Sequence, residues 1–118
     1  MLVKALKAKI HRAVVTDTKL DYPGSLAVDE HLLEQARIYP YESVLVANVT
    51  NGQRVETYVV PAPALSGEIT VLGAAAKKFS PGDIIIIMNF AFYSPQEVQG
   101  LKPKVITVDN ENKLKELL

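Results

Sequence analysis

A glycine followed by a serine near the N-terminus is the feature of this chain that has the most specific chemistry. Gly24 and Ser25 follow Tyr22 and Pro23 in a segment with the composition of a bend. Because glycine adopts strained backbone conformations at little steric cost, the Ser25 hydroxyl could attack the Gly24 carbonyl and convert the amide into an ester. Elimination from that ester would split the chain and leave residue 25 as dehydroalanine, and addition of water with loss of ammonia would turn that residue into a pyruvoyl group. The same dipeptide is a common turn, so the motif alone leaves both interpretations open.

A pyruvoyl group would need particular neighbours. Its ketone condenses with a substrate amine as a Schiff base and accepts the electrons released when a carboxylate leaves as carbon dioxide. Lys9 and Arg54 are candidate contacts for substrate carboxylates, since both are cationic and a guanidinium binds a carboxylate through two hydrogen bonds. Tyr58 lies four residues after Arg54, on the same face of an expected strand, and is a candidate proton donor.

Three other parts of the sequence offer supporting groups. Thr57 could donate a hydrogen bond to the Gly24 carbonyl during self-cleavage. The small residues Gly73, Ala74 and Ala75 offer backbone N–H groups beside a short expected helix. His11, two residues after Lys9 on the same strand face, could relay a proton. Each of these residues has an ordinary structural alternative, as a solvated strand residue, a packed helix start or a core histidine.

Composition limits the classes of function. The 118 residues suit one domain, and the 13 basic and 13 acidic residues balance, which argues against binding to nucleic acid or to anionic membranes. A neutral surface also permits self-association. The chain has no cysteine, only two histidines and no apolar run long enough to cross a bilayer. We therefore expect a cytoplasmic protein without a disulfide framework or a metal site.

Strand patterns dominate the chain. The expected strands cover residues 3–15, 25–28, 43–49, 54–60, 68–72, 84–90 and 105–108. Asn51-Gly52 predicts a hairpin, and Asp29 and Ser94 each read as the N-cap of a short helix. We expect a loop over residues 17–23. The apolar strand 84–90 is expected to be buried on both faces, and the polar tail 109–118 to be frayed. Many short strands with two or three small helices indicate a compact, mainly β barrel formed by residues 1–118 as one domain.

Together these motifs resemble one family, the pyruvoyl-dependent aspartate 1-decarboxylases of bacteria. The resemblance covers about residues 1–108 and is specific because several unrelated motifs occur in the family's order and spacing. The matching segments are Lys9-Ile10-His11-Arg12-Ala13, Tyr22-Pro23-Gly24-Ser25, Asn51-Gly52 with Arg54 and Thr57-Tyr58, Gly73-Ala74-Ala75-Ala76, Gly82-Asp83 and Lys102-Pro103.

The resemblance implies a fold, an activity and an assembly. The fold would be a double-psi β-barrel, and the assembly a homotetramer with active sites between neighbouring subunits. Self-cleavage between Gly24 and Ser25 would give a β-chain of residues 1–24 and an α-chain of residues 25–118 that begins with pyruvoyl. The reaction would convert L-aspartate to β-alanine and carbon dioxide, which supplies pantothenate and coenzyme A biosynthesis.

The resemblance also implies a role for each matching residue. Ser25 would become the pyruvoyl cofactor, Thr57 would assist cleavage after Gly24, and Tyr58 would donate the proton. Tyr22 would lie beside the cleaved bond. The substrate would be bound by Lys9 and Arg54 through its carboxylates, by Thr57, and by Gly73, Ala74 and Ala75 as the backbone wall of the pocket.

Three positions depart from the family pattern. Leu72 stands where asparagine is common, Ala47 where some members carry a large aromatic residue, and Pro23 stiffens the bend before Gly24. Leucine cannot donate a hydrogen bond to a substrate. Two alternatives therefore stay open: a non-catalytic barrel that serves as a binding or assembly module, and a pyruvoyl decarboxylase acting on another amino acid such as glutamate.

Overall fold

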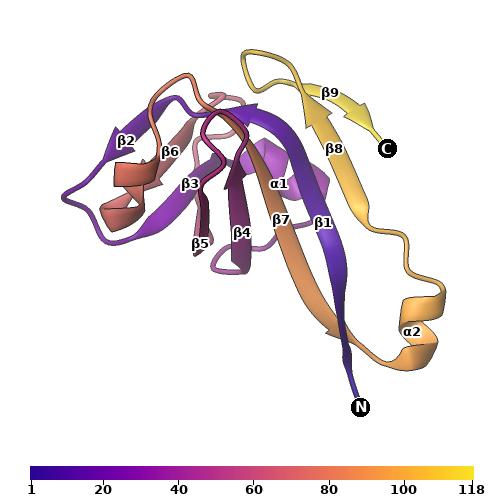
Figure 1. Cartoon of the computed structure of the whole chain (residues 1–118). Coiled ribbons are helices and arrows are strands. Elements are labelled where there is room, and N and C mark those ends of the chain that lie inside the picture. The colour runs from indigo at the N-terminus through magenta and orange to yellow at the C-terminus, as the bar shows by residue number, and fades with distance from the viewer.

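The computed structural model describes all 118 residues and contains nine strands and three short helices (Figure 1). The strands are β1 (Val3–Val14), β2 (Asp17–Lys19), β3 (Ser25–Asp29), β4 (Ser43–Asn48), β5 (Arg54–Ala62), β6 (Ile69–Leu72), β7 (Ile84–Tyr93), β8 (Lys104–Val108) and β9 (Leu114–Leu117). The helices are α1 (Glu30–Ala36), the 3-10 helix η1 (Gly73–Lys78) and α2 (Pro95–Gln99). The expected fold, mainly β with two or three short helices, is confirmed.

The nine strands form one strongly curved sheet in the order β2-β6-β3-β5-β4-β7-β1-β8-β9. Hydrogen bonds at the end of β1 join two distant parts of this sheet. The Thr16 N–H donates to the Ile69 carbonyl over 2.8 Å, and the Ile69 N–H donates to the Thr16 hydroxyl over 2.9 Å. They connect the chain just after β1 to the first residue of β6, so the sheet curls into a barrel-like structure.

Two loops of this barrel cross the end of a strand that lies between the strands they connect. β2 pairs with β6 in parallel and β3 pairs with β6 antiparallel, so residues 20–24 must pass over the C-terminal end of β6. Likewise β7 and β8 flank β1, and residues 94–103, which include α2, pass its N-terminal end. We call residues 20–24 the tight crossing and residues 94–103 the wide crossing. Such crossings are the feature that a psi-type barrel requires.

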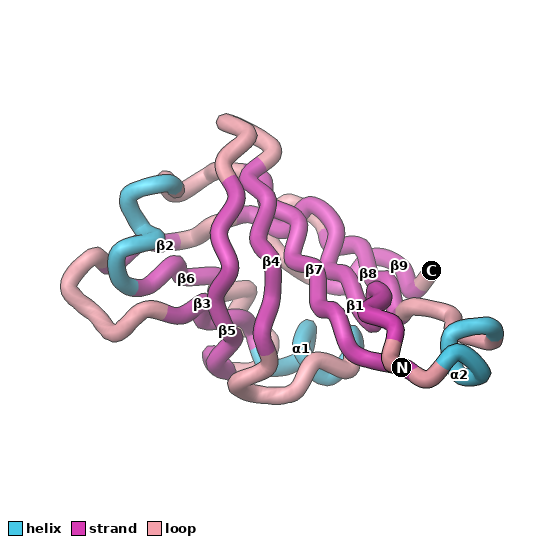
Figure 2. Tube along the Cα trace, turned by 60° about the horizontal axis from the view of Figure 1, so that its bottom comes forward, coloured by secondary structure: helices cyan, strands magenta, loops and turns pink.

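The two crossings lie at opposite ends of the molecule. Figure 2 shows the tight crossing as the loop at the far left, next to η1, and the wide crossing with α2 at the right. The core lies between them and consists of side chains from the inner face of the sheet, capped by α1 through Leu32, Leu33 and Ala36. Burial of each large aliphatic side chain contributes roughly 1.5–3 kcal/mol, so this core supplies the main stabilisation of the barrel.

Local sequence signals explain several element boundaries. The Asp29 side chain accepts a hydrogen bond from the His31 N–H and begins α1, as predicted. Ser94 and Glu97 form a reciprocal capping box at the start of α2, and Gly52 takes a positive φ in the predicted hairpin between β4 and β5. These caps and turns are short-range features, which is why the sequence predicts them well.

Three expectations about the elements are wrong. The segment 17–23 is not all loop, because Asp17–Lys19 forms β2 against β6. The tail is not frayed, because Leu114–Leu117 forms β9 against β8. The side chain of Asn112, which is 1% exposed, anchors that tail through hydrogen bonds to Val14 and Gly67. Finally, β7 is buried on one face only, since its buried residues alternate with half-buried ones.

Candidate active site

The Gly24–Ser25 bond lies at the end of the tight crossing, where the chain enters the barrel. Ser25 is the first residue of β3 and only 6% exposed, whereas Gly24 before it is exposed. Leu72, the last residue of β6, pairs with Ser25 on one side and with Lys19 on the other. The backbone of Leu72 therefore holds both ends of the crossing, and any residue type can supply that backbone contact.

Gly73 is the residue over which the tight crossing passes. It is buried, has a φ of +82°, and a Cβ added to it would lie 2.5 Å from the Gly24 Cα and 3.0 Å from the Tyr22 carbonyl oxygen. Real Cβ atoms do not approach other atoms this closely. Glycine is therefore required here both by its backbone conformation and by the loop that lies against it. Gly24 itself has room, since a Cβ there would have only the Leu72 carbonyl oxygen nearby, at 3.9 Å.

Strand β5 brings Thr57 and Tyr58 towards the same point. β3 and β5 pair in parallel from Leu26 opposite Val59 onward. Continuing that register backwards by one residue brings Ser25 level with Tyr58, and by two residues brings Gly24 level with Thr57. Alternation along the strand turns the two side chains to opposite faces, Thr57 half-buried and Tyr58 38% exposed. The predicted residues of cleavage and proton donation are thus neighbours of the Gly24–Ser25 bond.

The Tyr58 ring has an aromatic neighbour, Tyr41, in the loop between α1 and β4. Their ring centroids lie 6.3 Å apart and the planes are tilted by 40°. Tyr22, in the tight crossing, is 54% exposed, and the Lys19 ammonium lies 5.3 Å from the centre of its ring. Both tyrosines named in the sequence analysis therefore keep part of their surface open to solvent near the Gly24–Ser25 bond.

The predicted cationic residues lie away from the Gly24–Ser25 bond. Arg54 is exposed at the start of β5, and Lys9 is half-buried on β1. A row of cross-strand pairs connects the two strands on the outer face: Glu56 with Leu45, Leu45 with Met88, and Met88 with Lys9. Three strands separate β1 from β3 in the sheet, which corresponds to roughly 19 Å along its surface. One chain does not bring Lys9 beside Ser25.

His11 is also on β1, opposite Thr107 of β8. Burial and the neighbouring positive charges of Lys9 and Arg12 lower the pKa of His11 below its ordinary value of 6.5. The imidazole is therefore mostly neutral at pH 7, which is the form that can accept a proton. Three strands lie between β1 and β3 in the sheet, so one chain does not bring His11 to the Gly24–Ser25 bond.

The positions that depart from the family pattern also have defined places. Pro23 is exposed within the tight crossing, one residue before Gly24. Ala47 pairs with Arg54 and with Ile86 on the outer face of the sheet, so its small side chain leaves space beside the guanidinium. Leu72 acts through its backbone, as described above. None of these three side chains can form a hydrogen bond. In this chain the tight crossing is held by backbone pairing instead.

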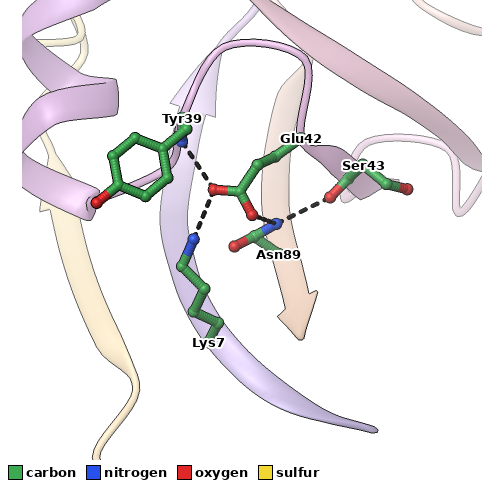
Figure 3. A network of polar contacts seen from close by, with 5 residues as sticks. All are labelled: Lys7, Tyr39, Glu42, Ser43 and Asn89. Carbon is green, nitrogen blue, oxygen red and sulfur yellow. Dashed lines mark hydrogen bonds and ion pairs between the residues drawn. The ribbon is translucent and has the colours of Figure 1, made fainter. Parts of the chain in front are cut away.

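One polar cluster near Tyr58 was missed by the sequence analysis (Figure 3). The Glu42 carboxylate accepts hydrogen bonds from the Lys7 ammonium, from the Tyr39 N–H over 2.8 Å and from the Asn89 amide over 3.3 Å. Burial alone would raise the pKa of Glu42, but these hydrogen bonds and the charge of Lys7 hold its pKa below the ordinary value of 4.5. The three partners of Glu42 come from β1, from the loop before β4, and from β7. No local sequence pattern therefore reveals the cluster.

The arrangement can perform a limited set of reactions. A buried serine follows an exposed glycine, and the β3–β5 register, continued backwards from Leu26 and Val59, brings Tyr58 and Thr57 level with them on the adjacent strand. Such a site suits attack of the hydroxyl on the preceding carbonyl and proton donation at residue 25. No group of three or more histidine, aspartate or glutamate side chains is placed to hold a metal ion, and no helix is long and apolar enough to span a membrane.

Comparison with known proteins assigns the chain to a family. Residues 1–115 match the family described as aspartate decarboxylase. An aspartate 1-decarboxylase from Coprothermobacter proteolyticus is 51% identical over 117 residues, which cover 99% of this chain and 96% of that protein. The enzyme of the same name from Lactiplantibacillus plantarum is 50% identical over 114 residues, 97% of this chain and 88% of that protein. The chain therefore belongs to the aspartate decarboxylase family.

Proposed function

We propose that this protein is a self-processing decarboxylase whose cofactor is a pyruvoyl group made from Ser25. Membership of the family makes it a carbon–carbon lyase that acts on aspartate. Loss of the α-carboxylate from L-aspartate as carbon dioxide and its replacement by a proton gives β-alanine, the precursor through which the enzyme would supply pantothenate and coenzyme A synthesis. A cytoplasmic location stays a prediction.

The observation that carries this proposal is the position of the Gly24–Ser25 bond against Gly73. The loop over β6 is held by Leu72 at both ends and lies so close to Gly73 that no side chain fits there. A short loop held in this way at both ends has few backbone conformations. The Ser25 hydroxyl is then restricted to positions beside the Gly24 carbonyl, which favours intramolecular attack.

Each residue near the bond would have one task. The Thr57 hydroxyl would donate a hydrogen bond to the Gly24 carbonyl oxygen as negative charge develops there. Once formed, the pyruvoyl ketone would bind the substrate amine and act as the electron acceptor for decarboxylation. Tyr58 would then donate a proton to the substrate carbon. Gly73, Ala74 and Ala75 would line the pocket with backbone, and Tyr22 would cover the side next to the tight crossing.

Lys9, His11 and Arg54 would act from a neighbouring copy of the chain. They lie on strands β1 and β5, and Lys9 and His11 are separated from Ser25 by several strands within one chain. The outer face between Lys9 and Arg54 carries half-buried apolar residues: Leu45, Ala47, Ile86 and Met88. An apolar face of this kind suits packing against a second copy. In a homotetramer it would bring the cationic residues of one chain towards the Ser25 of the next, where they would bind the carboxylates of aspartate.

Mass spectrometry of the purified protein tests the proposal. We expect two products, residues 1–24 and residues 25–118, and a mass for the larger one that corresponds to an N-terminal pyruvoyl group. The intact chain has a mass of 12.9 kDa, and its persistence after prolonged warming would contradict self-cleavage. Release of carbon dioxide from aspartate, compared with release from glutamate, measures the activity and the substrate class.

The matched variant is Ser25→Ala, which removes only the hydroxyl oxygen. We expect this variant to fold, to remain a single chain and to release no carbon dioxide. Borohydride reduction in the presence of aspartate should trap the amino acid on the wild-type protein and not on the variant. An active Ser25→Ala protein would exclude the pyruvoyl mechanism.

A further inference from the structure

The structure contains a polar cluster whose function the proposed reaction leaves unexplained. It consists of Lys7 on β1, Glu42 before β4 and Asn89 on β7, which we call the Lys7–Glu42–Asn89 cluster (Figure 3). Asn89 is 1% exposed, and its amide also donates to the Ser43 carbonyl over 2.9 Å. The Lys7–Glu42 ion pair is only half-buried, and such a pair contributes little net stability when compared with apolar packing. A role in positioning another residue is therefore worth testing.

The loop held by this cluster contains a backbone conformation that needs support. Tyr41 has a φ of +71°, which is unusual for a bulky side chain. Hydrogen bonds fix the residues around it, because the Tyr41 N–H donates to the Val59 carbonyl and the Val59 N–H donates to the Glu42 carbonyl. The Glu42 side chain adds a third restraint by accepting from the Tyr39 N–H. A strained residue held from several sides is a common feature of functional sites.

The strain has an evident result at Tyr58. The conformation of Tyr41 places the centre of its ring 6.3 Å from the centre of the Tyr58 ring. In addition, the backbones of Tyr41 and Glu42 form hydrogen bonds with Val59, the residue directly after Tyr58. Glu42 therefore restrains the tyrosine from two directions, through the aromatic contact and through the backbone of β5. Neither Glu42 nor Lys7 forms a hydrogen bond or ion pair with the Gly24–Ser25 segment.

We propose that the Lys7–Glu42–Asn89 cluster positions the Tyr58 side chain for proton donation through Tyr41. The inference rests on the role proposed for Tyr58. It adds that Lys7 contributes to catalysis from the other product of self-cleavage, since Lys7 belongs to residues 1–24 whereas Glu42, Tyr41 and Tyr58 belong to residues 25–118. The ion pair between Lys7 and Glu42 would thus link the two products at the place where it affects the reaction.

Steady-state kinetics of the processed protein test this inference with Glu42→Gln and Lys7→Met. Glu42→Gln keeps the length of the side chain, Lys7→Met shortens it by one atom, and both remove its charge. We expect complete self-cleavage, an unchanged KM and a kcat lower by about ten- to a hundredfold, because a misplaced catalytic group slows the step without weakening binding. The solvent deuterium isotope effect on kcat should also rise, because proton donation becomes rate-limiting. Matched controls are Glu34→Gln on α1 and Lys4→Met on β1, both exposed, which should behave as wild type.

A double-variant cycle separates positioning from a general structural defect. If the cluster acts through Tyr58, Glu42→Gln should change kcat by about twofold or less in a Tyr58→Phe background. An equal loss in both backgrounds would overturn the inference while leaving the proposed function intact. Wild-type kcat in the Tyr58→Phe protein would overturn both the role of Tyr58 and the inference.

Tyrosine ring resonances give a second measurement that needs no activity. The signals of Tyr58 in protein labelled with 13C-tyrosine are identified by their loss in Tyr58→Phe. They should shift in Glu42→Gln and Lys7→Met and stay fixed in Glu34→Gln and Lys4→Met. Should the wild-type chain neither cleave nor release carbon dioxide, the proposed function fails, and these spectra alone decide the positioning. Unshifted Tyr58 signals in both cluster variants would overturn it.

Discussion

The tight and wide crossings share a topology and differ in almost everything else. In each, a loop connects two antiparallel strands that flank a third. The tight crossing uses residues 20–24, contains no helix and lies against buried Gly73, whereas the wide crossing uses residues 94–103 and contains a helix with a reciprocal capping box. The wide crossing satisfies its own backbone groups locally. The tight crossing depends on the strands beneath it, and it is the one that contains the Gly-Ser bond.

The comparison suggests that restraint, rather than topology, prepares a bond for self-cleavage. A glycine is associated with each crossing. Gly73 lies under the tight crossing, and Gly100 lies within the wide crossing. A Cβ on Gly73 would collide with Gly24, but a Cβ on Gly100 would have no atom within 4 Å. The two glycines therefore form a matched pair for experiments.

The largest effect is expected from Gly73→Ala. The new methyl group would lie 2.5 Å from the Gly24 Cα, and alanine is strained at a φ of +82°, so the tight crossing must move away from its present position. We expect self-cleavage to be slowed at least about a hundredfold, because small displacements of reacting groups are costly. The amount of intact chain over time, measured by mass spectrometry, gives the rate.

Gly100→Ala is the control for that substitution. Its φ of −101° is accessible to alanine and the space is open, so cleavage should proceed as in wild type. Equal cleavage rates in Gly73→Ala and Gly100→Ala would show that contact with Gly73 does not prepare the bond.

The next largest effect is expected from Asp29→Ala at the far end of β3. The Asp29 carboxylate is 1% exposed and accepts hydrogen bonds from the N–H groups of His31, Leu65 and Gly67, each 2.9 Å long. Removing it leaves three backbone donors without this partner, and we expect the free energy of unfolding to fall by about 2–4 kcal/mol. Urea denaturation of the uncleaved Ser25→Ala background measures the loss without interference from processing. A change below about 0.5 kcal/mol would mean that solvent replaces these bonds.

A smaller effect is expected at the wide crossing from Ser94→Ala. This substitution removes the N-cap of α2, whose hydroxyl accepts from the Glu97 N–H. The expected loss of stability is about 1 kcal/mol, and self-cleavage should not change, because the wide crossing has no contact with the tight one. The melting temperature and the mass spectrum report the two quantities. Slower processing in Ser94→Ala would connect the two crossings in a way that the structure does not suggest.

The smallest expected effect is the pH dependence of the Lys7–Glu42 contact, which ties β1 to the start of β4. Since the folded-state pKa of Glu42 is below 4.5, the unfolded chain binds more protons between the two values, and stability rises with pH in that window. The wild type should therefore exceed Glu42→Gln in stability by about 1 kcal/mol or less above pH 4.5. The difference should disappear as the pH falls through the folded-state pKa. A difference that persists in strong acid would show that packing, not charge, is responsible.

The sequence predicted those parts of the structure that depend on neighbours in the chain. The caps at Asp29 and Ser94 and the turn at Asn51-Gly52 involve residues at most five positions apart, and all three are present. The curl of the sheet, β2 and β9 depend on partners far away in the chain, and periodicity contains no information about them. β9 was missed because the anchor of the tail, Asn112, binds Val14, a residue 98 positions away.

The candidate site divides in the same way. Gly24, Ser25, Thr57 and Tyr58 were predicted together, and the β3–β5 register, continued backwards from Leu26 and Val59, brings Ser25 level with Tyr58 and Gly24 level with Thr57. Gly73 was predicted as part of a pocket wall, but its contact with Gly24 follows only from the crossing over β6. Lys9 and His11 were predicted for the same pocket, although one chain holds them several strands away. Glu42 has no motif, because its three partners come from three separate segments.

Self-cleavage would leave β1 as part of a separate polypeptide. β1 lies in residues 1–24, yet it pairs with β7 on one edge and β8 on the other, both of which lie in residues 25–118. Self-cleavage would remove the covalent tether but leave an interior strand in place, so folding would become an association of two polypeptides and its midpoint would depend on protein concentration. A denatured sample would have to recapture a 24-residue peptide from solution. Processing would thus make unfolding harder to reverse in dilute solution, although every contact of the barrel would persist.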